Sequence, residues 1–181
     1  MVIAFSTNTS AQESFGNAGL EIALPVGDWA EDTYGIGIGG SGGYELGISD
    51  NFAVNANVGI VFLSINSDVS DLIKSSFLVP IQVGGRYYFD QSRSGFFAEA
   101  KVGLHLFSTS TEDVDLGPIG TIEGESNTES YFSAAPQIGY FLNENISLAL
   151  RYQLFFIPED ADVGQESDTG SFIGLKAAYN F

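Results

Sequence analysis

The chain contains no cysteine, a single histidine and only six lysine and arginine residues, against 23 aspartate and glutamate residues among its 181. The absence of cysteine excludes disulfide bonds and thiol catalysis, and it removes the soft ligands of most structural zinc sites. The formal charge of −17 argues against nucleic acid as a partner, because contacts to phosphate groups require lysine and arginine.

The sequence also lacks any apolar run approaching the roughly 18 to 20 residues that a membrane-spanning helix requires. A membrane location would therefore have to be reached with strands. Residues 1–12 lack the basic start and most of the apolar core of a secretory signal, although Thr9, Ser10 and Ala11 are similar to the end of one, with cleavage after Ala11. We expect residues 1–12 to be a signal-peptide remnant or a disordered lead-in, and residues 13–181 to form one domain.

What the chain does contain favours strands over helices. Hydrophobic residues make up 44% of it, and there are 22 glycine, 15 phenylalanine and 8 tyrosine residues. Acidic disordered proteins lack such aromatic and aliphatic residues, so this chain is expected to fold. Aromatic residues are enriched in strands, and the composition therefore indicates strands joined by tight turns.

Apolar and polar residues alternate along most of the chain, as they do in strands whose two faces differ. In the last strand, Ile173 and Leu175 share the apolar face, and Gly174 and Lys176 share the other. Eight such strands are expected, at residues 19–24, 34–47, 52–62, 77–89, 96–107, 131–142, 146–156 and 170–181. Long and short links alternate between them, the long links lying at about residues 26–33, 66–75, 108–130 and 157–170.

The two faces of these strands differ in charge. One face carries no charged residue, whereas the other carries mostly glycine, alanine, serine, asparagine and glutamine with a few charges. A soluble barrel would place a densely charged face in water, and small residues suit the crowded interior of an eight-stranded barrel. Aromatic residues mark both ends of the uncharged face, as in the aromatic belts of membrane proteins. They are Phe52, Tyr87, Phe89, Phe96, Tyr140, Tyr179 and Phe181 at the short-link end, and Tyr34, Phe62, Phe77, Phe132 and Phe156 at the long-link end.

The closing strand ends on Phe181, with Tyr179 two positions earlier on the same face. With these features, residues 17–181 resemble the small eight-stranded outer-membrane proteins of the OmpA-domain, OmpX and OmpW kind, often called the porin family. The resemblance implies an all-β fold, an eight-stranded antiparallel transmembrane up-and-down β-barrel in the Gram-negative outer membrane. It also implies extracellular long loops, periplasmic termini, and a monomer in contact with outer-membrane lipid and lipopolysaccharide. In that family the barrel assembly machinery reads the closing strand, here Tyr179 and Phe181.

Two prolines depart from this pattern. Pro80 and Pro136 lie inside expected strands, where each forfeits a ladder hydrogen bond in a sheet that has no edge. We therefore expect a bulge or a local irregularity at both positions.

The inward face of the expected strands holds both positive and negative side chains. If the turn 90–95 closes a regular hairpin, Arg86 lies opposite Glu99. Charges in a narrow lumen are costly unless they are paired, so we expect a lumen charge network. Such a network either plugs and rigidifies the barrel or lines a narrow selective passage, and the sequence leaves both open. Its members are Glu21, Glu45, Arg86, Glu99, Lys101, Arg151 and Lys176.

Most of the carboxylates lie in the four long links, where Lys74 is the only basic residue. A solvated acidic surface explains them, but carboxylate oxygens also bind hard divalent cations. The candidate ligands are Asp113, Asp115, Asp160, Asp162, Glu166 and Asp168, although their spacing does not fit an EF-hand. Such cations would act as partners that bridge the loops to lipopolysaccharide phosphates.

No residue pattern indicates catalysis or a cofactor. His105, the only histidine, falls on the lumen face, and the glycines at 35, 37, 39 and 40 precede no helix that would make a phosphate-binding loop. The predicted function is a non-enzymatic surface protein whose filled barrel displays acidic loops for envelope integrity or surface interaction. The alternative is a narrow porin-like channel or a portal for small or hydrophobic solutes.

Overall fold

The computed structural model describes residues 14–27, 33–65, 73–90, 94–111, 114–115, 121–122, 126–158 and 167–181. The signal-peptide remnant expected at residues 1–12 lies outside these ranges. Within them, no helix is long and apolar enough to cross a membrane. Almost all of the described residues belong to strands.

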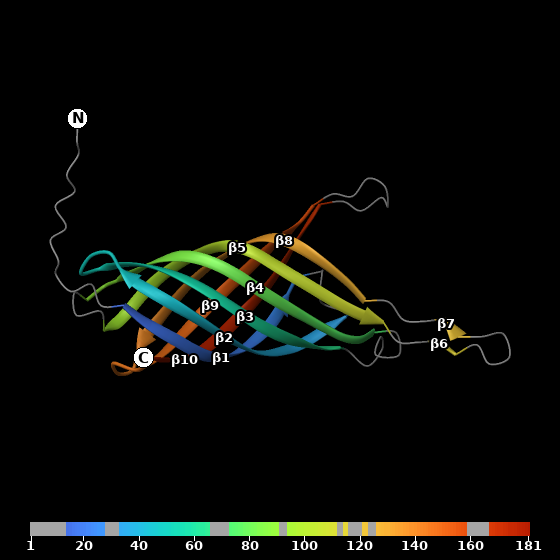
Figure 1. Ribbon diagram of the computed structural model, residues 1–181, viewed down its shortest axis with the longest axis horizontal. Helices are drawn as coiled ribbons and strands as arrows, with labels where there is room; N and C mark the ends of the chain where they lie inside the picture. Colours follow the sequence, from blue (N-terminus) through green and yellow to red (C-terminus); the bar gives the residue numbers. More distant parts are fainter. Residues whose placement is uncertain are drawn as a thin grey trace, which may run out of the picture.

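Eight long antiparallel strands close into one barrel (Figure 1). Their order around the barrel is β1-β10-β9-β8-β5-β4-β3-β2, so the first strand pairs with the last. A separate two-stranded ladder of β6 and β7 lies beyond the barrel at the end where β5 finishes (Figure 1). The predicted eight-stranded up-and-down barrel is confirmed. The bounds are β1 Ser14–Val26, β2 Tyr34–Gly47, β3 Phe52–Ile65, β4 Ile73–Tyr88, β5 Gly95–Thr111, β6 Val114–Asp115, β7 Thr121–Ile122, β8 Ser126–Phe141, β9 Ile146–Ile157 and β10 Asp168–Asn180.

Several strands extend beyond the segments predicted from alternation. Pairing of β5 with β8 continues from Ser108↔Thr128 to Ser110↔Ser126, so part of the link expected at 108–130 is strand. The residues of this extension are mostly serine, threonine and asparagine, which show no apolar alternation although their backbones still pair. Hydrophobic alternation therefore marks the apolar belt of each strand and misses its polar end.

The barrel has two different ends, called here the turn end and the loop end. Strands β2, β4 and β8 end at the turn end, where the C-terminus also lies, and strands β1, β3, β5 and β9 end at the loop end (Figure 1). In the turn after β8, Asn143 Oδ1 accepts hydrogen bonds from the backbone N–H groups of Asn145 at 2.9 Å and Ile146 at 2.8 Å. These side-chain bonds reinforce the backbone bond of the turn, in which Leu142 N–H donates to the Ile146 carbonyl at 2.8 Å.

The first and last strands form the seam of the barrel. Their ladder runs from Asn17↔Asn180 to Val26↔Ser171. At its turn-end limit, Gly16 N–H donates to the Phe181 carbonyl at 2.8 Å, and Phe181 N–H donates to the Gly16 carbonyl at 2.9 Å. The closed sheet consequently leaves no edge strand with a row of unpaired backbone groups.

Burial alternates along the strands and sorts the side chains onto an outer and an inner face. In β1, Leu20 is 73% exposed, whereas its neighbour Glu21 is 3% exposed. In β2, Leu46 is 48% exposed, whereas its neighbour Glu45 is completely buried. Apolar side chains thus face outward and charged ones inward, the reverse of a soluble protein and the arrangement that the sequence predicted.

Both prolines interrupt one ladder without shifting its register. The β3–β4 ladder has no pairs between Val58↔Ile81 and Val61↔Leu78, around Pro80. The β8–β9 ladder likewise has none between Ala134↔Leu154 and Gln137↔Arg151, around Pro136. Because each proline lacks an N–H group toward one neighbour only, the ladder on its other side continues. The expected irregularities are present, but neither of them is a bulge.

Tyr34 corrects one prediction about the aromatic belts. The register of β2 with β3 shifts between Tyr34 and Gly37, so a bulge separates Tyr34 from the regular part of its strand. One extra residue moves the side chains beyond it to the opposite face. Tyr34 therefore packs on Phe107 inside the barrel, with ring centroids 5.8 Å apart, and not in the outer belt.

Candidate functional site in the barrel lumen

Three layers of side chains fill the inside of the barrel. The loop-end cluster is apolar and the turn-end cluster is mainly aromatic, and along each strand the charged and amide side chains lie between them. The loop-end cluster consists of Ala23, Val61, Leu63, Leu78, Tyr131, Phe155 and Phe172, with Tyr34, Phe107 and Ile157 packed against it. The turn-end cluster consists of Ala53, Tyr88, Phe97, Phe141 and Ala149, with Phe15 packed against it.

Arg86 is the centre of a chain of ion pairs in the middle layer. Its Nη1 lies 2.9 Å from Glu45 Oε2, and its Nη2 lies 2.8 Å from Glu99 Oε2. Lys101 Nζ lies 2.9 Å from the other oxygen of Glu99, Oε1, and Gln137 Nε2 donates to Glu99 Oε2 at 2.6 Å. These charged side chains are almost completely buried, so each depends on its partners for the solvation that water would otherwise supply.

The hairpin of β4 and β5 brings Arg86 and Glu99 together. The two residues are direct cross-strand partners, and Phe89 N–H donates to the Phe96 carbonyl at 3.1 Å, as the sequence-based hairpin requires. The guanidinium also lies over the ring of Phe97, with Cζ 4.3 Å from the ring centroid. Arg86 is therefore held by two carboxylates and an aromatic face together.

A second ion pair crosses from one strand to the next but one. Arg151 Nη2 of β9 donates to Glu21 Oε1 of β1 at 2.5 Å, although β10 lies between these strands. The residue of β10 beneath this bridge is Gly174, the cross-strand partner of Arg151. A Cβ atom at Gly174 would lie only 2.2 Å from Glu21 Oε1, so the bridge requires glycine at this position.

Lys176 is the one member of the lumen charge network that lacks an ion pair within the described part of the chain. It lies opposite Glu21 in the register, but that carboxylate bonds Arg151 instead. Lys176 Nζ donates to Asn17 Oδ1 at 3.3 Å, and the lysine is only 8% exposed. The structure thus joins the other six predicted members in ion pairs and leaves this cation with a neutral partner.

The aromatic rings of the loop-end and turn-end clusters were not predicted from the sequence, although the sequence contains a signal for them. Five pairs of adjacent aromatic residues lie in strands: Tyr87-Tyr88, Phe96-Phe97, Tyr131-Phe132, Tyr140-Phe141 and Phe155-Phe156. Because neighbours in a strand point to opposite faces, each pair places one ring in the outer belt and one in the lumen. Adjacent aromatic residues in a strand therefore predict rings inside the lumen as well as rings in the outer belts.

Amide side chains separate the charges from the loop-end cluster. Gln82 Nε2 donates to Ser133 Oγ at 3.1 Å and to Gln153 Oε1 at 3.3 Å. Gln153 Nε2 donates in turn to the Ala134 carbonyl at 3.2 Å, beside the ladder break at Pro136. This layer supplies hydrogen bonds where the backbone ladder is interrupted.

His105 lies beside this amide layer and is completely buried. Its ring stacks on Phe155 at 5.9 Å, and neither ring nitrogen has a hydrogen-bond partner in the described part of the chain. Within the described residues, therefore, no hydrogen bond orients this imidazole.

The remaining predicted site residues lie outside the lumen. Tyr179 and Phe181 are exposed at the turn end, with their rings stacked at 6.3 Å. Asp168 begins β10 at the loop end, where its Oδ1 accepts the Thr169 N–H bond at 2.7 Å. The described residues contain no group of three side chains suited to a metal ion. Of the other candidate ligands, Asp113, Asp160, Asp162, Glu166 and the side chain of Asp115 lie outside the description.

The outer face carries aromatic pairs near both ends and an apolar band between them. Phe132 and Phe156 stack at 6.0 Å at the loop end, and Phe96 packs on Tyr140 at 4.7 Å at the turn end. The large exposed side chains between these pairs are mostly leucine, isoleucine and valine, with Tyr152 among them. This surface matches an apolar membrane interior bounded by aromatic belts.

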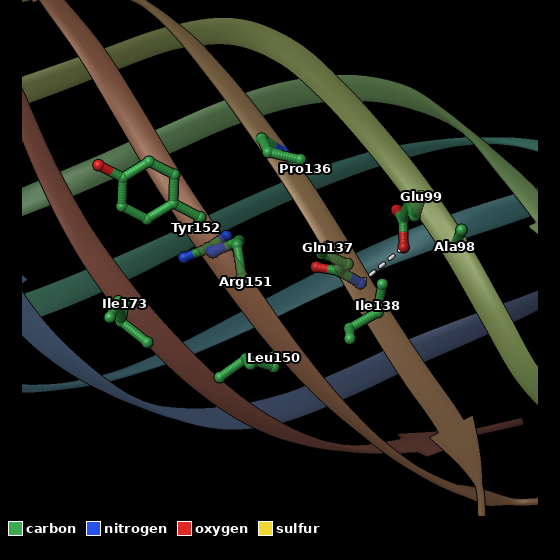
Figure 2. A pocket seen from close by; sticks show the side chains of 9 residues that line it. All are labelled: Ala98, Glu99, Pro136, Gln137, Ile138, Leu150, Arg151, Tyr152 and Ile173. Carbon is green, nitrogen blue, oxygen red and sulfur yellow. Dashed lines mark hydrogen bonds between the residues drawn. The ribbon is translucent and has the colours of Figure 1, made fainter.

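An apolar groove of about 470 Å³ indents the outer face at the β8–β9 ladder break (Figure 2). Pro136, Leu150 and Tyr152 line it from adjacent strands. Glu99 and Gln137, which hydrogen-bond each other in the lumen, also border it (Figure 2). The groove and the charge network therefore approach each other at one of the two gaps in the backbone ladders.

A closed barrel with charges inside, an uncharged face outside and an aromatic belt at each end belongs to the class of transmembrane β-barrels. The family comparison agrees with this assignment. The chain belongs to the family of the outer membrane protein beta-barrel domain, whose model matches residues 1–181. It is accordingly a protein of the bacterial outer membrane.

Solved structures with the same fold come from Gram-negative bacteria. The attachment invasion locus protein Ail of Yersinia pestis has a TM-score of 0.61 at 13% identity, covering 94% of this chain and 99% of that one. The N-terminal barrel domain of Pseudomonas aeruginosa OprF has a TM-score of 0.58 at 14% identity, with 94% and 98% covered. Neisserial surface protein A has a TM-score of 0.54 at 16% identity, with 92% and 95% covered. No curated protein sequence matches the chain significantly.

Proposed function

We propose that this outer-membrane barrel is a non-enzymatic protein with a closed lumen, which displays its long acidic loops outside the cell for envelope integrity or surface interaction. The observation that carries the proposal is the three-layered lumen. An ion-paired middle layer lies between an apolar cluster at one end and an aromatic cluster at the other. An ion following the axis of the barrel would have to pass all three.

The energetics of the three layers support closure. Moving Arg86 aside would separate it from two carboxylates and would leave buried charges unpaired. Passing the turn-end cluster would require the packed rings of Tyr88, Phe97 and Phe141 to separate. Neither rearrangement is available to a rigid barrel without a large cost.

Planar-bilayer conductance of the refolded protein tests this proposal. A shift between boiled and unboiled samples on a gel first shows that the barrel is folded. We expect no single-channel steps from folded protein, and none from the Val83→Ala control, which alters only the exposed outer face.

Reproducible steps from the folded wild-type protein would contradict a closed lumen. If their ion selectivity also changed in Arg86→Ala or Lys101→Ala, the charge network would be the lining of a channel. The alternative of a narrow porin-like passage would then replace the closed barrel.

The outward parts of the molecule complete the proposal. The loop end faces the cell exterior and the termini face the periplasm. The exposed rings of Tyr179 and Phe181 are available for recognition by the barrel assembly machinery. Divalent cations at the acidic loops, shared with lipopolysaccharide phosphates, remain the proposed partners of that surface.

A second candidate is a lateral portal for hydrophobic solutes. The groove at Pro136 favours it, because an apolar surface there meets a gap in the β8–β9 ladder. A hydrophobic solute would pass between the lumen and the membrane through this gap. It would not have to cross both the loop-end cluster and the turn-end cluster. The lateral portal requires the gap in the β8–β9 ladder, whereas the closed barrel does not.

A further inference from the structure

One positive charge in the lumen lacks a counter-charge within the part of the chain that the structure describes. Ion pairs of 2.5 to 2.9 Å match the three buried glutamates to three of the four buried basic residues. Lys176 is the fourth, and its Nζ bonds only the neutral Oδ1 of Asn17. A buried ammonium group of this kind is costly unless an anion accompanies it.

The side chain of Lys176 nevertheless has a defined direction within the lumen. Its side chain leans toward the turn end across Gly19, where an added Cβ atom would lie 2.9 Å from Lys176 Cε. It thereby avoids Glu21, its cross-strand partner, and reaches Asn17 instead. Glycine at position 19 thus positions the ammonium group away from the carboxylate.

A small cavity lies where the lysine points. It measures about 10 Å³, which is room for one water molecule or one small ion. No carboxylate lines it, so its charged wall is entirely positive. The polar side chains around it are those of Asn17, Arg86, Gln137, Ser147, Lys176 and Asn180.

Three of these side chains carry hydrogen-bond donors that a bound anion could accept. Lys176 has three N–H donors and uses one of them on Asn17, whose own amide group carries two further N–H donors. Ser147 Oγ accepts a bond from Asn180 Nδ2 at 3.2 Å, which leaves its own proton for another acceptor. Donors from β1, β9 and β10 therefore converge on one small space.

We propose that this cavity binds one small monovalent anion of the chloride class, held by Lys176, Asn17 and Ser147. The positive wall selects negative charge, and the small volume favours a monatomic anion over sulfate or phosphate. The anion neutralises the lumen and fills the space between the charge network and the turn-end cluster. This site is independent of whether the barrel is closed or conducting.

Bromide provides the test, because it substitutes for chloride and scatters X-rays anomalously. Crystals of the full chain soaked in sodium bromide are expected to show an anomalous peak in this cavity. In solution, chloride or bromide is expected to raise the temperature of the boiled-to-unboiled gel transition by a few degrees over sodium gluconate at equal ionic strength.

Matched variants separate this site from general salt effects. Lys176→Met is expected to lose both the peak and the halide-dependent shift, and Ser147→Ala to weaken both while keeping the lysine. Lys74→Met removes the same charge from the loop-end start of β4 and is expected to keep both. An empty or water-filled cavity in bromide, equal transitions in halide and gluconate, or a halide shift that survives in Lys176→Met would each overturn the proposal.

Discussion

His105 is a buried polar residue whose burial is poorly compensated. It is completely enclosed between Phe155 and Phe172, and both ring nitrogens lack hydrogen-bond partners in the described structure. Leaving a buried polar group unpaired costs about 1 to 3 kcal/mol. A position with such a cost is one where an apolar residue of similar size should improve the fold.

We therefore expect His105→Leu to raise the free energy of unfolding by about 1 to 2 kcal/mol, because it removes the unpaired nitrogens and keeps most of the volume. Urea unfolding of the refolded barrel in lipid vesicles measures this change. His105→Gln, which keeps an amide to satisfy, serves as the control and should show no gain. Destabilisation by leucine would mean that the imidazole has a polar partner after all.

The charged residues show which contacts a sequence predicts and which it does not. Arg86 and Glu99 were expected to meet because one short turn fixes their register, and they are cross-strand partners. The bond between Arg151 and Glu21 spans 130 residues and passes over Gly174. Nothing in local spacing specifies that a glycine lets two side chains bridge across an intervening strand.

Strand β8, like β4 at Pro80, has a gap in one of its two ladders. Pro136 lacks the N–H group that would bond toward β9, and the ladder is empty between Ala134↔Leu154 and Gln137↔Arg151. Gln153 compensates in part by donating to the Ala134 carbonyl. The gap is thus the consequence of one side chain and should close when that side chain is changed.

We expect Pro136→Val to restore the missing pairs, because valine supplies the N–H group and favours the strand conformation. The amide of residue 136 should become protected from hydrogen exchange. An amide at 136 that stays unprotected would show that the gap has another cause. Ile138→Val, on the same outer face of β8, is the matched control and should leave protection unchanged.

The same variant distinguishes the two proposed functions. If hydrophobic solutes pass through the gap, wild-type protein in liposomes takes up a fatty acid faster than Pro136→Val does. Equal uptake by both proteins would remove the lateral portal.

Strand faces were more predictable than strand lengths. Alternation identified the inner and outer residues because the environments on the two sides of this sheet differ so strongly. It failed at Tyr34, where a bulge reversed the faces, and at the end of β5 and the start of β8, where serine, threonine and asparagine occupy both faces. Hydrophobic alternation predicts the face on which a residue lies only where the two faces of the strand have different environments.

The orientation of the whole molecule is testable because the chain has no cysteine to interfere. We expect Ser167→Cys, at the loop end, to react with a membrane-impermeant maleimide on intact cells. Glu144→Cys, in the turn after β8, should react only after the outer membrane is opened. Labelling of residue 144 alone on intact cells would reverse the proposed orientation.

The arrangement of the whole barrel followed from the sequence because eight alternating segments and two kinds of link leave few topologies. The packing of side chains across the lumen followed only in part, since the sequence predicted a filled barrel but left a plug and a narrow passage both open. It depends on how Tyr88, Phe97 and Phe141 pack together from β4, β5 and β8, and inward alternation alone does not reveal whether side chains meet at the centre.

The seam between β1 and β10 also determines the order of events during folding. The two strands lie at opposite ends of the chain, so the loop that their pairing closes is nearly the whole sequence and forms slowly. Glu21 belongs to β1 and Arg151 to β9, so their bond forms only when that loop closes. Until then the hairpins expose both backbone edges and unneutralised charges. Sealing the sheet and neutralising its interior are therefore a single final step, and a chain stalled before it would be prone to aggregate.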